Sequence, residues 1–279
     1  MRTLPLFIAL LGGCSFSAAT PANSDSPIVV DGPVNDTAVD ARPIDARPID
    51  AAPVGRVTGA QVQWKFNEGS GLTAADSAGL TPAYDLVRTS LLNSEWSNGG
   101  LTFTAASNAR TVSMLTRPTT ACLASKSATL EAWIVPKNET QGLPTQPSMP
   151  PRPAIIAGLT SSINSRSFEI SQAGRHIIGR TRTMAPNALE LQASDVVTAG
   201  ALVHVALVQE QATQRLYING VEKDSQISPL MSWEAYAMVV GGDTNLNAPW
   251  LGTARAVVLY CSALTAVQVQ GNFAFGPTL

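Results

Sequence analysis

Residues 202–223 read LVHVALVQEQATQRLYINGVEK, and this stretch indicates the fold class of the whole chain. Its first third, 202–208, is an apolar run that contains one histidine and several β-branched residues, which is typical of a buried strand. Further on, Leu216 and Ile218 alternate with an arginine and a tyrosine and therefore share one face of a second strand. Asn219-Gly220 follows, a dipeptide that favours a two-residue β-turn because both turn positions need positive φ. The stretch predicts a hairpin and the beginning of a third strand.

The chain beyond residue 56 contains more short strands of this kind, separated by turns rich in glycine, asparagine and proline. No long helical pattern interrupts them, which indicates an all-β protein, an antiparallel two-sheet β-sandwich. One short C-terminal helix is expected at 265–272, where Thr265 and Gln268 have the spacing of a capping box. The other strands are expected at residues 61–66, 99–104, 129–135, 154–159, 167–171, 175–182, 188–193, 236–241 and 250–260.

The composition of the 279 residues excludes some classes of partner. Charged residues make up 14% of the chain, well below the ~25% of an average globular protein. The formal net charge is −2 and no run of lysine or arginine occurs, so we expect no nucleic-acid partner. The roughly 220 residues after the N-terminal segment are a normal size for one β-sandwich, and we expect a monomer.

The N-terminus has the pattern of an export signal. A short positive start precedes an apolar segment at 4–11, which is too short to span a membrane as a helix. The segment ends in Leu11-Gly12-Gly13-Cys14, which resembles the lipobox of bacterial lipoproteins. That resemblance implies cleavage before Cys14, lipidation of Cys14 and anchoring to a membrane of the bacterial cell envelope, at its periplasmic face or at the cell surface. An ordinary signal peptide cut near residues 17–19 is the alternative.

A tether is expected at residues 14–56, between the signal peptide at 1–13 and a globular domain at 57–279. The five-residue unit Asp-Ala-Arg-Pro-Ile starts at Asp40 and again at Asp45, and a related unit follows. Proline at every fifth position blocks helix and sheet alike, and the segment has too few apolar residues to form a core. We therefore expect a disordered tether that reaches on the order of 100 Å at most.

Two cysteines remain once Cys14 is assigned to the lipid, namely Cys122 and Cys261. Export places them in an oxidising compartment, where cysteine pairs form disulfides. We predict a Cys122–Cys261 disulfide, and two separate buried thiols are the alternative.

Several motifs of the globular part follow one another in an order that resembles a known family. They are WKFNEGSG at 64–71, GGLTF at 99–103, TLEAWI at 129–134, HVALV at 204–208, RLYINGV at 215–221 and VVLY at 257–260. This succession is similar to the laminin-G-like jelly-roll domain of the concanavalin-A-like lectin and glucanase superfamily. The resemblance implies two antiparallel sheets of about six or seven strands each. It also implies a role in binding carbohydrates, proteins or cell surfaces, although some members are glycosidases.

Glycosidases of this superfamily carry the motif E-x-D-x-x-E, whose carboxylates flank the sugar bond. The nearest segments here are EISQAG from Glu169 and ELQASD from Glu190, and neither keeps the full set of acids. The end positions of such a motif also face opposite sides of a regular strand. We therefore expect no catalytic residues and no enzymatic activity, with Glu131 and Glu169 as exposed acids on strands.

The histidines and two of the tryptophans are expected to be structural. His176 and His204 have no Cys, Asp or Glu at the spacing of metal ligands, which favours structural histidines. Trp64 and Trp133 occupy alternating strand positions and are expected to pack in the core.

The candidate ligand-binding residues lie near turns and in one oxygen-rich loop. Trp96 and Trp250 stand beside turns rich in glycine and asparagine, where an indole can stack on a sugar ring or simply pack. Asp243, Asn245 and Asn247 form the oxygen-rich loop and complete the predicted set. The proline-rich loop at 137–153 is the largest addition to a minimal sandwich, and it is either functional or a disordered insertion.

The resemblance also implies a structural calcium site between an N-terminal turn and the last strand, and this chain departs from it. The family's last strand commonly reads G-x-I-D-E-V-R-I-Y, whereas residues 252–260 read GTARAVVLY. Arg255 replaces the acid, and calcium needs roughly six to eight oxygen ligands. We expect Arg255 to pair with Glu68 or Asp76 instead. No cofactor or metal is expected, apart from weak calcium binding at the Asp243 loop.

Together these features predict an exported, lipid-anchored, non-catalytic module that binds a glycan or a cell-surface ligand. The first alternative is a structural or adhesion protein that makes only protein contacts. The second alternative is a glycoside hydrolase.

Overall fold

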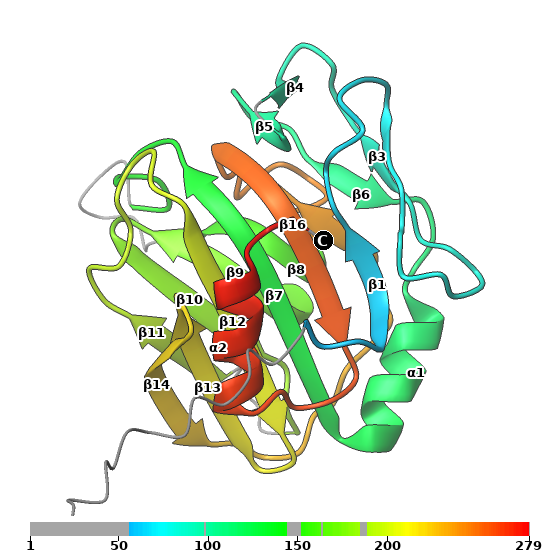
Figure 1. Ribbon diagram of the computed structural model, residues 1–279, viewed down its shortest axis with the longest axis vertical. Coiled ribbons are helices and arrows are strands. Elements are labelled where there is room, and N and C mark those ends of the chain that lie inside the picture. Colours follow the sequence, from blue (N-terminus) through cyan, green and yellow to red (C-terminus); the bar gives the residue numbers. More distant parts are fainter. Residues whose placement is uncertain (1–55, 98, 144–151, 163, 185–188, 279) are drawn as a thin grey trace, which may run out of the picture. The chain divides into compact units, whose positions relative to one another are not determined.

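The computed structural model describes residues 56–97, 99–143, 152–162, 164–184 and 189–278. These residues form two antiparallel β-sheets and two short helices (Figure 1). The predicted signal peptide, the lipidation site Cys14 and the tether lie outside the described residues, as does the central part of the proline-rich loop at 144–151. The all-β, antiparallel sandwich expected from the sequence is confirmed.

Sheet A has eight strands, in the spatial order β14, β13, β12, β7, β16, β5 and β4, with β1 paired beside β5 on the same edge of β16. Its strands are β1 (Ala60–Trp64), β4 (Ser94–Ser97), β5 (Gly100–Phe103), β7 (Ser127–Pro136), β12 (Val203–Glu210), β13 (Thr213–Ile218), β14 (Val221–Ile227) and β16 (Gly252–Tyr260).

Sheet B also has eight strands, in the spatial order β11, β10, β9, β8, β15, β6, β3 and β2. Its strands are β2 (Thr73–Ala74), β3 (Leu86–Arg88), β6 (Ala109–Thr111), β8 (Ala154–Ser162), β9 (Ser165–Ala173), β10 (His176–Thr181), β11 (Leu189–Ala193) and β15 (Met238–Val240). Each sheet thus has slightly more strands than the six or seven that the resemblance implies, and some of them, such as β2 and β3, are only two or three residues long.

The hairpin predicted from the sequence is present in sheet A. β12 pairs with β13 along its length, and β13 pairs with β14 across the turn at Asn219-Gly220. Both turn residues have positive φ, 51° at Asn219 and 77° at Gly220, as this turn requires. Leu216 and Ile218 point into the core between the sheets, whereas Tyr217 belongs to a cluster on the opposite face.

Sheet A buries apolar side chains on both of its faces. The inner face packs against sheet B and contributes Val203, Val205 and Leu207 of β12 to the main core. The outer face carries a second cluster that includes Trp133 and Ala206 and that is covered by α2 (Ala266–Phe275), as Figure 1 shows. A strand buried on both faces reads as a continuous apolar run, which explains the pattern of β12.

The predicted C-terminal helix is confirmed with its cap. The Thr265 side chain accepts a hydrogen bond from the Gln268 N–H, and the Gln268 side chain accepts one from the Thr265 N–H. The helix α1 (Thr116–Ser125) was not expected, because its threonines and Pro118 have low helix propensity. Pro118 is tolerated because it lies in the first turn, where backbone N–H groups have no intrahelical partner.

The predicted disulfide is confirmed. Cys122 of α1 is bonded to Cys261, which directly follows β16, and the bond joins residues 139 positions apart in the sequence. It fixes α1 to the end of β16 in sheet A. Disulfides persist in oxidising compartments, so this bond indicates an extracytoplasmic environment.

Glu131 and Glu169 are not exposed acids, and that expectation is wrong for both. Glu131 lies under α2, where its Oε1 is 3.3 Å from His204 Nε2 and its Oε2 accepts a hydrogen bond from the Asn272 side chain. Glu169 is buried on β9 beside Arg166 and Arg180. Each acid is compatible with burial because cationic or amide groups from neighbouring elements replace water.

His204 and two tryptophans have the structural roles expected for them. The His204 ring packs 4.3 Å from the Trp133 ring, beneath α2. Trp64 is fully buried in the main core, where its indole N–H donates to the Tyr84 carbonyl at 2.9 Å. A hydrogen-bonded indole N–H makes the complete burial of this side chain possible.

Candidate functional site

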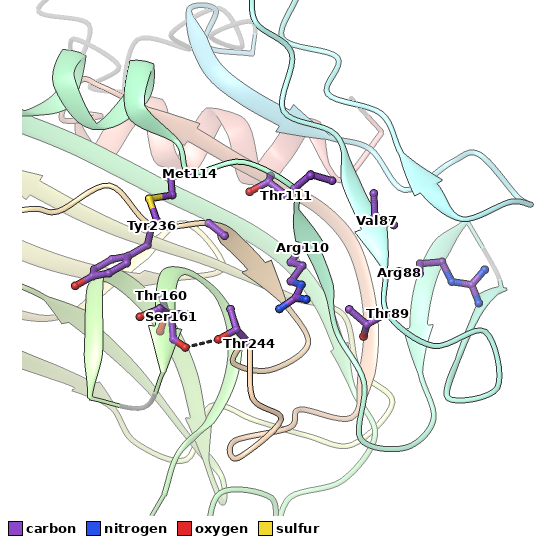
Figure 2. A pocket seen from close by; sticks show the side chains of 12 residues that line it. Val87, Arg88, Thr89, Arg110, Thr111, Met114, Thr160, Ser161, Tyr236 and Thr244 are labelled. Atoms are coloured by element: carbon purple, nitrogen blue, oxygen red, sulfur yellow. Dashed lines mark hydrogen bonds between the residues drawn. The ribbon is translucent and has the colours of Figure 1, made fainter.

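A groove with a volume of about 680 Å³ lies on the outer face of sheet B (Figure 2). Strands β3, β6 and β8, the end of the segment before β15 and the loop after β15 form it. A volume in the range of roughly 300–1,000 Å³ is typical of small-molecule sites in proteins. The lining residues are Val87, Arg88, Thr89, Arg110, Thr111, Val112, Met114, Thr160, Ser161, Tyr236, Ala237 and Thr244.

The strand register places Arg110 on the outer face, over the floor of the groove. Arg110 of β6 lies directly opposite Val87 of β3 and Val239 of β15. The flanking residue Ala109 is part of the main core. Because successive side chains on a strand point to opposite faces, Arg110 points away from the core. Gly158 follows Val239 in the same row, so β8 adds no side chain there.

The threonine hydroxyls of the groove donate their protons to backbone carbonyls. Thr89 Oγ1 donates to the Asn108 carbonyl at 2.9 Å, and Thr244 Oγ1 donates to the Ser161 carbonyl. Thr160 Oγ1 lies within hydrogen-bonding distance of the Ser162 carbonyl at 2.8 Å. A hydroxyl that has given its proton away can only accept further hydrogen bonds. Thr160 is fully buried, and Thr89 Oγ1 also accepts a hydrogen bond from the Asn108 N–H at 3.2 Å. Thr244 and the remaining lone pair of Thr89 therefore offer acceptors to a ligand that carries hydroxyl groups.

The rim of the groove is apolar and unusually exposed. Val112 is 88% exposed and Met114 is 60% exposed, and both lie within three residues of the end of strand β6. Met114 lies next to the half-buried ring of Tyr236 (Figure 2). An aromatic side chain with apolar neighbours at a polar groove suits a ligand with both hydroxyl groups and C–H faces.

The two arginines of the groove have different surroundings. Arg88 points away from Arg110 (Figure 2) and donates to the Gly71 carbonyl at 2.8 Å and to Ser94. Burial lowers the pKa of the Arg88 guanidinium, and the charge of Glu95 opposes that shift. The Arg110 side chain is exposed and makes no hydrogen bond or ion pair with any part of the chain that the structure describes. The Arg88 side chain thus has a structural role, and the Arg110 side chain is available to a ligand in the groove.

Tyr236 is held in place by a charged pair at the edge of the groove. Its hydroxyl donates to Glu234 at 2.5 Å, and Glu234 also pairs with Arg182 at 2.6 Å. The Tyr236 hydrogen bond, followed by that of Arg182, lowers the pKa of Glu234. Burial, followed by the Glu234 contact, raises the pKa of Tyr236. The phenol therefore stays protonated, and its oxygen accepts a hydrogen bond from Arg182 Nη1 at 3.4 Å.

Two of the predicted ligand-binding residues are buried, which contradicts the prediction for them. Trp250 is fully buried, and its indole N–H donates to Gln172 Oε1 at 2.8 Å, so no face of the ring is open to a sugar. Asp243 is also fully buried, and its Oδ1 accepts a hydrogen bond from the Asn247 N–H at 2.6 Å. The turn after β15 resembles a ligand loop in sequence because residues that shape turns and residues that bind ligands are of the same types.

The other predicted residues do not join the groove. Trp96 lies in a separate hollow of about 110 Å³ beside Gly99 and Gly100, and its indole N–H donates to the Gly71 carbonyl at 2.8 Å. That volume is below the roughly 300 Å³ of typical ligand sites. Asn245 and Asn247 are exposed on the loop, of which Thr244 alone lines the groove. Ligand binding by Trp96, Asn245 and Asn247 stays a prediction.

Arg255 does not pair with Glu68 or Asp76, so that prediction is wrong. Asp76 accepts hydrogen bonds from the backbone N–H groups of Gln63, Ala78 and Tyr84, which occupy both of its oxygens. Arg255 instead extends along the glycines that begin β5. The Asp76 carboxylate thus holds three backbone N–H groups of the N-terminal turns. Within the described ranges, no three His, Cys, Asp or Glu side chains are grouped so as to hold a metal ion.

Glu169 and Glu190, which begin the two segments most similar to a glycosidase motif, lie on different strands and both form ion pairs with Arg180. Glu169 of β9, Arg180 of β10 and Glu190 of β11 are opposite one another in register. Arg180 Nε is 2.8 Å from Glu190 Oε2, and Arg180 Nη1 is 3.5 Å from Glu169 Oε1. Burial raises the pKa of Glu169, and Arg166 and Arg180 oppose that shift. Neither acid lines the groove.

The residues that form the groove were not predicted from the sequence. They come mainly from β3, β6 and the segment after β6, which are too short for a periodic pattern. One signal was present: from Trp96 to Leu130 the chain contains no Asp or Glu, although it contains Arg110, Arg117 and Lys126. A long stretch with positive charges only indicates a locally cationic surface on a chain whose net charge is −2.

Comparison with known families and structures agrees with this architecture. The family model described as "Concanavalin A-like lectin/glucanases superfamily" matches residues 98–270, more than half of the chain. No curated protein shows significant sequence similarity to the chain. Among the described residues, none of the helices is both long and apolar enough to cross a membrane.

Several solved structures share the fold at low sequence identity. The binding domain of botulinum neurotoxin serotype D is 12% identical with a TM-score of 0.56, and the match covers 78% of this chain and 52% of that one. Trypanosoma rangeli sialidase in complex with 2,3-difluorosialic acid is 17% identical with a TM-score of 0.55, over 77% of this chain and 33% of that one. The chain therefore spans about half of the first structure and about a third of the second. Identities this low show similarity of fold alone.

Proposed function

Because the chain belongs to the concanavalin A-like lectin/glucanases superfamily, we propose that it is an exported, lipid-anchored module that binds a glycan in the sheet B groove and has no catalytic activity. The lipid anchor follows from the lipobox pattern at Cys14. The disulfide supports export, because such bonds persist outside the cytoplasm.

The arrangement of hydrogen-bond acceptors in the groove carries the glycan proposal. Thr89 and Thr244 each donate their hydroxyl proton to a backbone carbonyl. Thr244 therefore offers its oxygen as an acceptor to the ligand, and Thr89 offers the lone pair that is left beside its bond from the Asn108 N–H. A sugar supplies many hydroxyl donors and an apolar C–H face, and the latter matches the rim of Val112 and Met114. This combination is what a saccharide needs and what a purely apolar ligand cannot satisfy.

The test is a glycan array followed by titration calorimetry with the strongest glycan. The double variant Val112→Ala/Met114→Ala removes the exposed rim, and Val221→Ala/Ile227→Ala is the control because it removes exposed apolar groups from β14 in sheet A. Loss of about 1 kcal/mol of contact would weaken binding roughly fivefold in the groove variant. The control should bind as the wild type does. Equal binding by all three proteins would contradict the proposed site.

The non-catalytic part of the proposal rests on the acids of sheet B. Glu169 is fully buried and Glu190 is paired with Arg180, so neither is presented to a ligand in the groove. We expect no release of reducing sugar from β-glucans or from the glycan found on the array. Release that is abolished by Glu190→Gln would show that the chain is a glycosidase.

The lipid anchor is tested on Cys14. In a bacterial host, the wild-type chain should incorporate labelled fatty acid and sediment with membranes, and Cys14→Ser should do neither. Membrane association and an absence of label in both forms would contradict lipidation.

A further inference from the structure

We infer that the groove selects acidic saccharides and that Arg110 binds the carboxylate or sulfate group of the sugar. This inference rests on the proposed glycan-binding function and names the ligand class for the same site. It makes Arg110 the specificity-determining residue, whereas the acceptor oxygens and the rim recognise features that all sugars share.

The first observation is the free guanidinium of Arg110. It is exposed above β6 and has no hydrogen bond or ion pair with the described residues. Other arginines of sheet B are engaged: Arg180 pairs with Glu169 and Glu190, and Arg182 pairs with Glu234. Arg88 is held by the Gly71 carbonyl and by Ser94, so Arg110 is the arginine of the groove whose charged group is left open to a ligand.

The second observation is the absence of acids among the residues that line the groove. The lining contains the two arginines and no Asp or Glu. Glu234, which reaches the edge of the groove through Tyr236, is already paired with Arg182 at 2.6 Å. The local charge is therefore positive on a chain whose net charge is −2. An anion is attracted to this groove and not to the protein as a whole.

The third observation is the division between donors and acceptors. The hydroxyl groups of Thr89 and Thr244 offer acceptors, which suit sugar hydroxyls and repel the oxygens of an acid group. A carboxylate or sulfate accepts hydrogen bonds only, so it needs the donors of Arg110. The planar guanidinium donates two parallel hydrogen bonds to such a group. Figure 2 shows Arg110 between Thr89 and Thr244, and all three line the same groove.

The test uses probes that differ only in charge, with the full chain. Oligogalacturonate and its methyl ester form one pair, dextran sulfate and dextran form a second pair, and polyglutamate represents an acidic peptide. The variants are Arg110→Gln, which removes the charge, Arg110→Lys, which restores it, and Arg175→Gln. The last is the control because Arg175 is exposed, loses the same charge and does not line the groove.

We expect the wild-type chain to bind at least one acidic probe about 10 to 100 times more tightly than its neutral partner. Arg110→Gln should lose that preference, Arg110→Lys should recover part of it, and Arg175→Gln should keep it. The acidic probe should also bind more weakly as salt concentration rises, because the contact is near the surface.

Three outcomes would overturn the inference, and they differ in what they say of the proposed function. Equal binding of acidic and neutral saccharides, unchanged in Arg110→Gln, would refute acid selection and leave glycan binding intact. Tighter binding of polyglutamate than of any saccharide would show that the charge serves a peptide. Binding of no saccharide, in the probe set or on the array, would refute the proposed function itself.

Discussion

Removing the disulfide should destabilise the chain strongly, because the bond closes a long loop. It joins Cys122 and Cys261, which are 139 positions apart. In the chain-entropy description, closing a loop of that length lowers the entropy of the unfolded state by about 17 cal/mol/K, or about 5 kcal/mol at 25 °C. The perturbation is the double variant Cys122→Ala/Cys261→Ala, made in a Cys14→Ser background so that no third cysteine can exchange.

Urea denaturation followed by tryptophan fluorescence measures the effect. For an m value of about 3 kcal/mol/M, a loss of about 5 kcal/mol lowers the midpoint by roughly 1.7 M. Because Cys122 is fully buried, the alanine variant also loses packing, so the Cys14→Ser protein in its oxidised and reduced forms is the cleaner comparison. Equal midpoints for those two forms would refute the idea that the bond constrains the unfolded chain.

Three further predictions concern stability. Thr265→Ala removes the hydroxyl that caps α2 and should cost about 1 kcal/mol in urea denaturation; an unchanged midpoint would contradict the role of the capping box. Gly158→Ala places a Cβ 2.8 Å from the Phe168 carbonyl oxygen and 3.0 Å from Glu169 Cα, so it should destabilise the chain by about 1–3 kcal/mol. Gly200→Ala is the control for strain from positive φ alone, because its Cβ meets no atom within 4 Å. A smaller loss of unfolding free energy in Gly158→Ala than in Gly200→Ala would contradict the predicted clash and show that β8 and β9 move apart easily. Burial raises the pKa of Glu169, so the folded state binds more protons than the unfolded state between the two pKa values, and stability falls as pH rises through that window. The free energy of unfolding of the wild type minus that of Glu169→Gln should therefore decrease from pH 4 to pH 7, and an increase would reverse the assignment.

The fold was predictable from the sequence wherever strands are long. β7, β12, β13 and β16 each show a run or an alternation that defines a strand, and Asn219-Gly220 defines the turn. The C-terminal helix was predictable from its cap, because Thr265 and Gln268 have a spacing that serves little else. By contrast, α1 contains threonines and Pro118, whose local preferences oppose a helix, and its disulfide and its contacts with β7 outweigh them.

The candidate site was less predictable than the fold. Trp250 and Asp243 have the residue types and the turn context of ligand-binding residues, yet both are buried parts of the core and of a turn. The distinction depends on which face of a segment is covered, and that is decided by residues distant in the sequence. Gln172, for example, accepts the indole N–H of Trp250 from a strand 78 positions away.

The groove brings together residues that do not indicate a binding site when each is considered alone in the sequence. Arg110, Tyr236 and Thr244 come from three separate segments and meet only because β6 and β15 are paired in sheet B. No local motif links them in the sequence. The acid-free stretch around Arg110 indicated a cationic surface, but its place in a groove required the strand order.

The central claim is that a saccharide occupies the sheet B groove, and a crystal structure of the chain with its tightest-binding glycan tests it most directly. We predict density for the sugar between Arg110 and Tyr236, with an acid group of the sugar on the guanidinium and a C–H face on Met114. Density for the sugar at the hollow beside Trp96, or over α2 on sheet A, with an empty groove, would contradict the account.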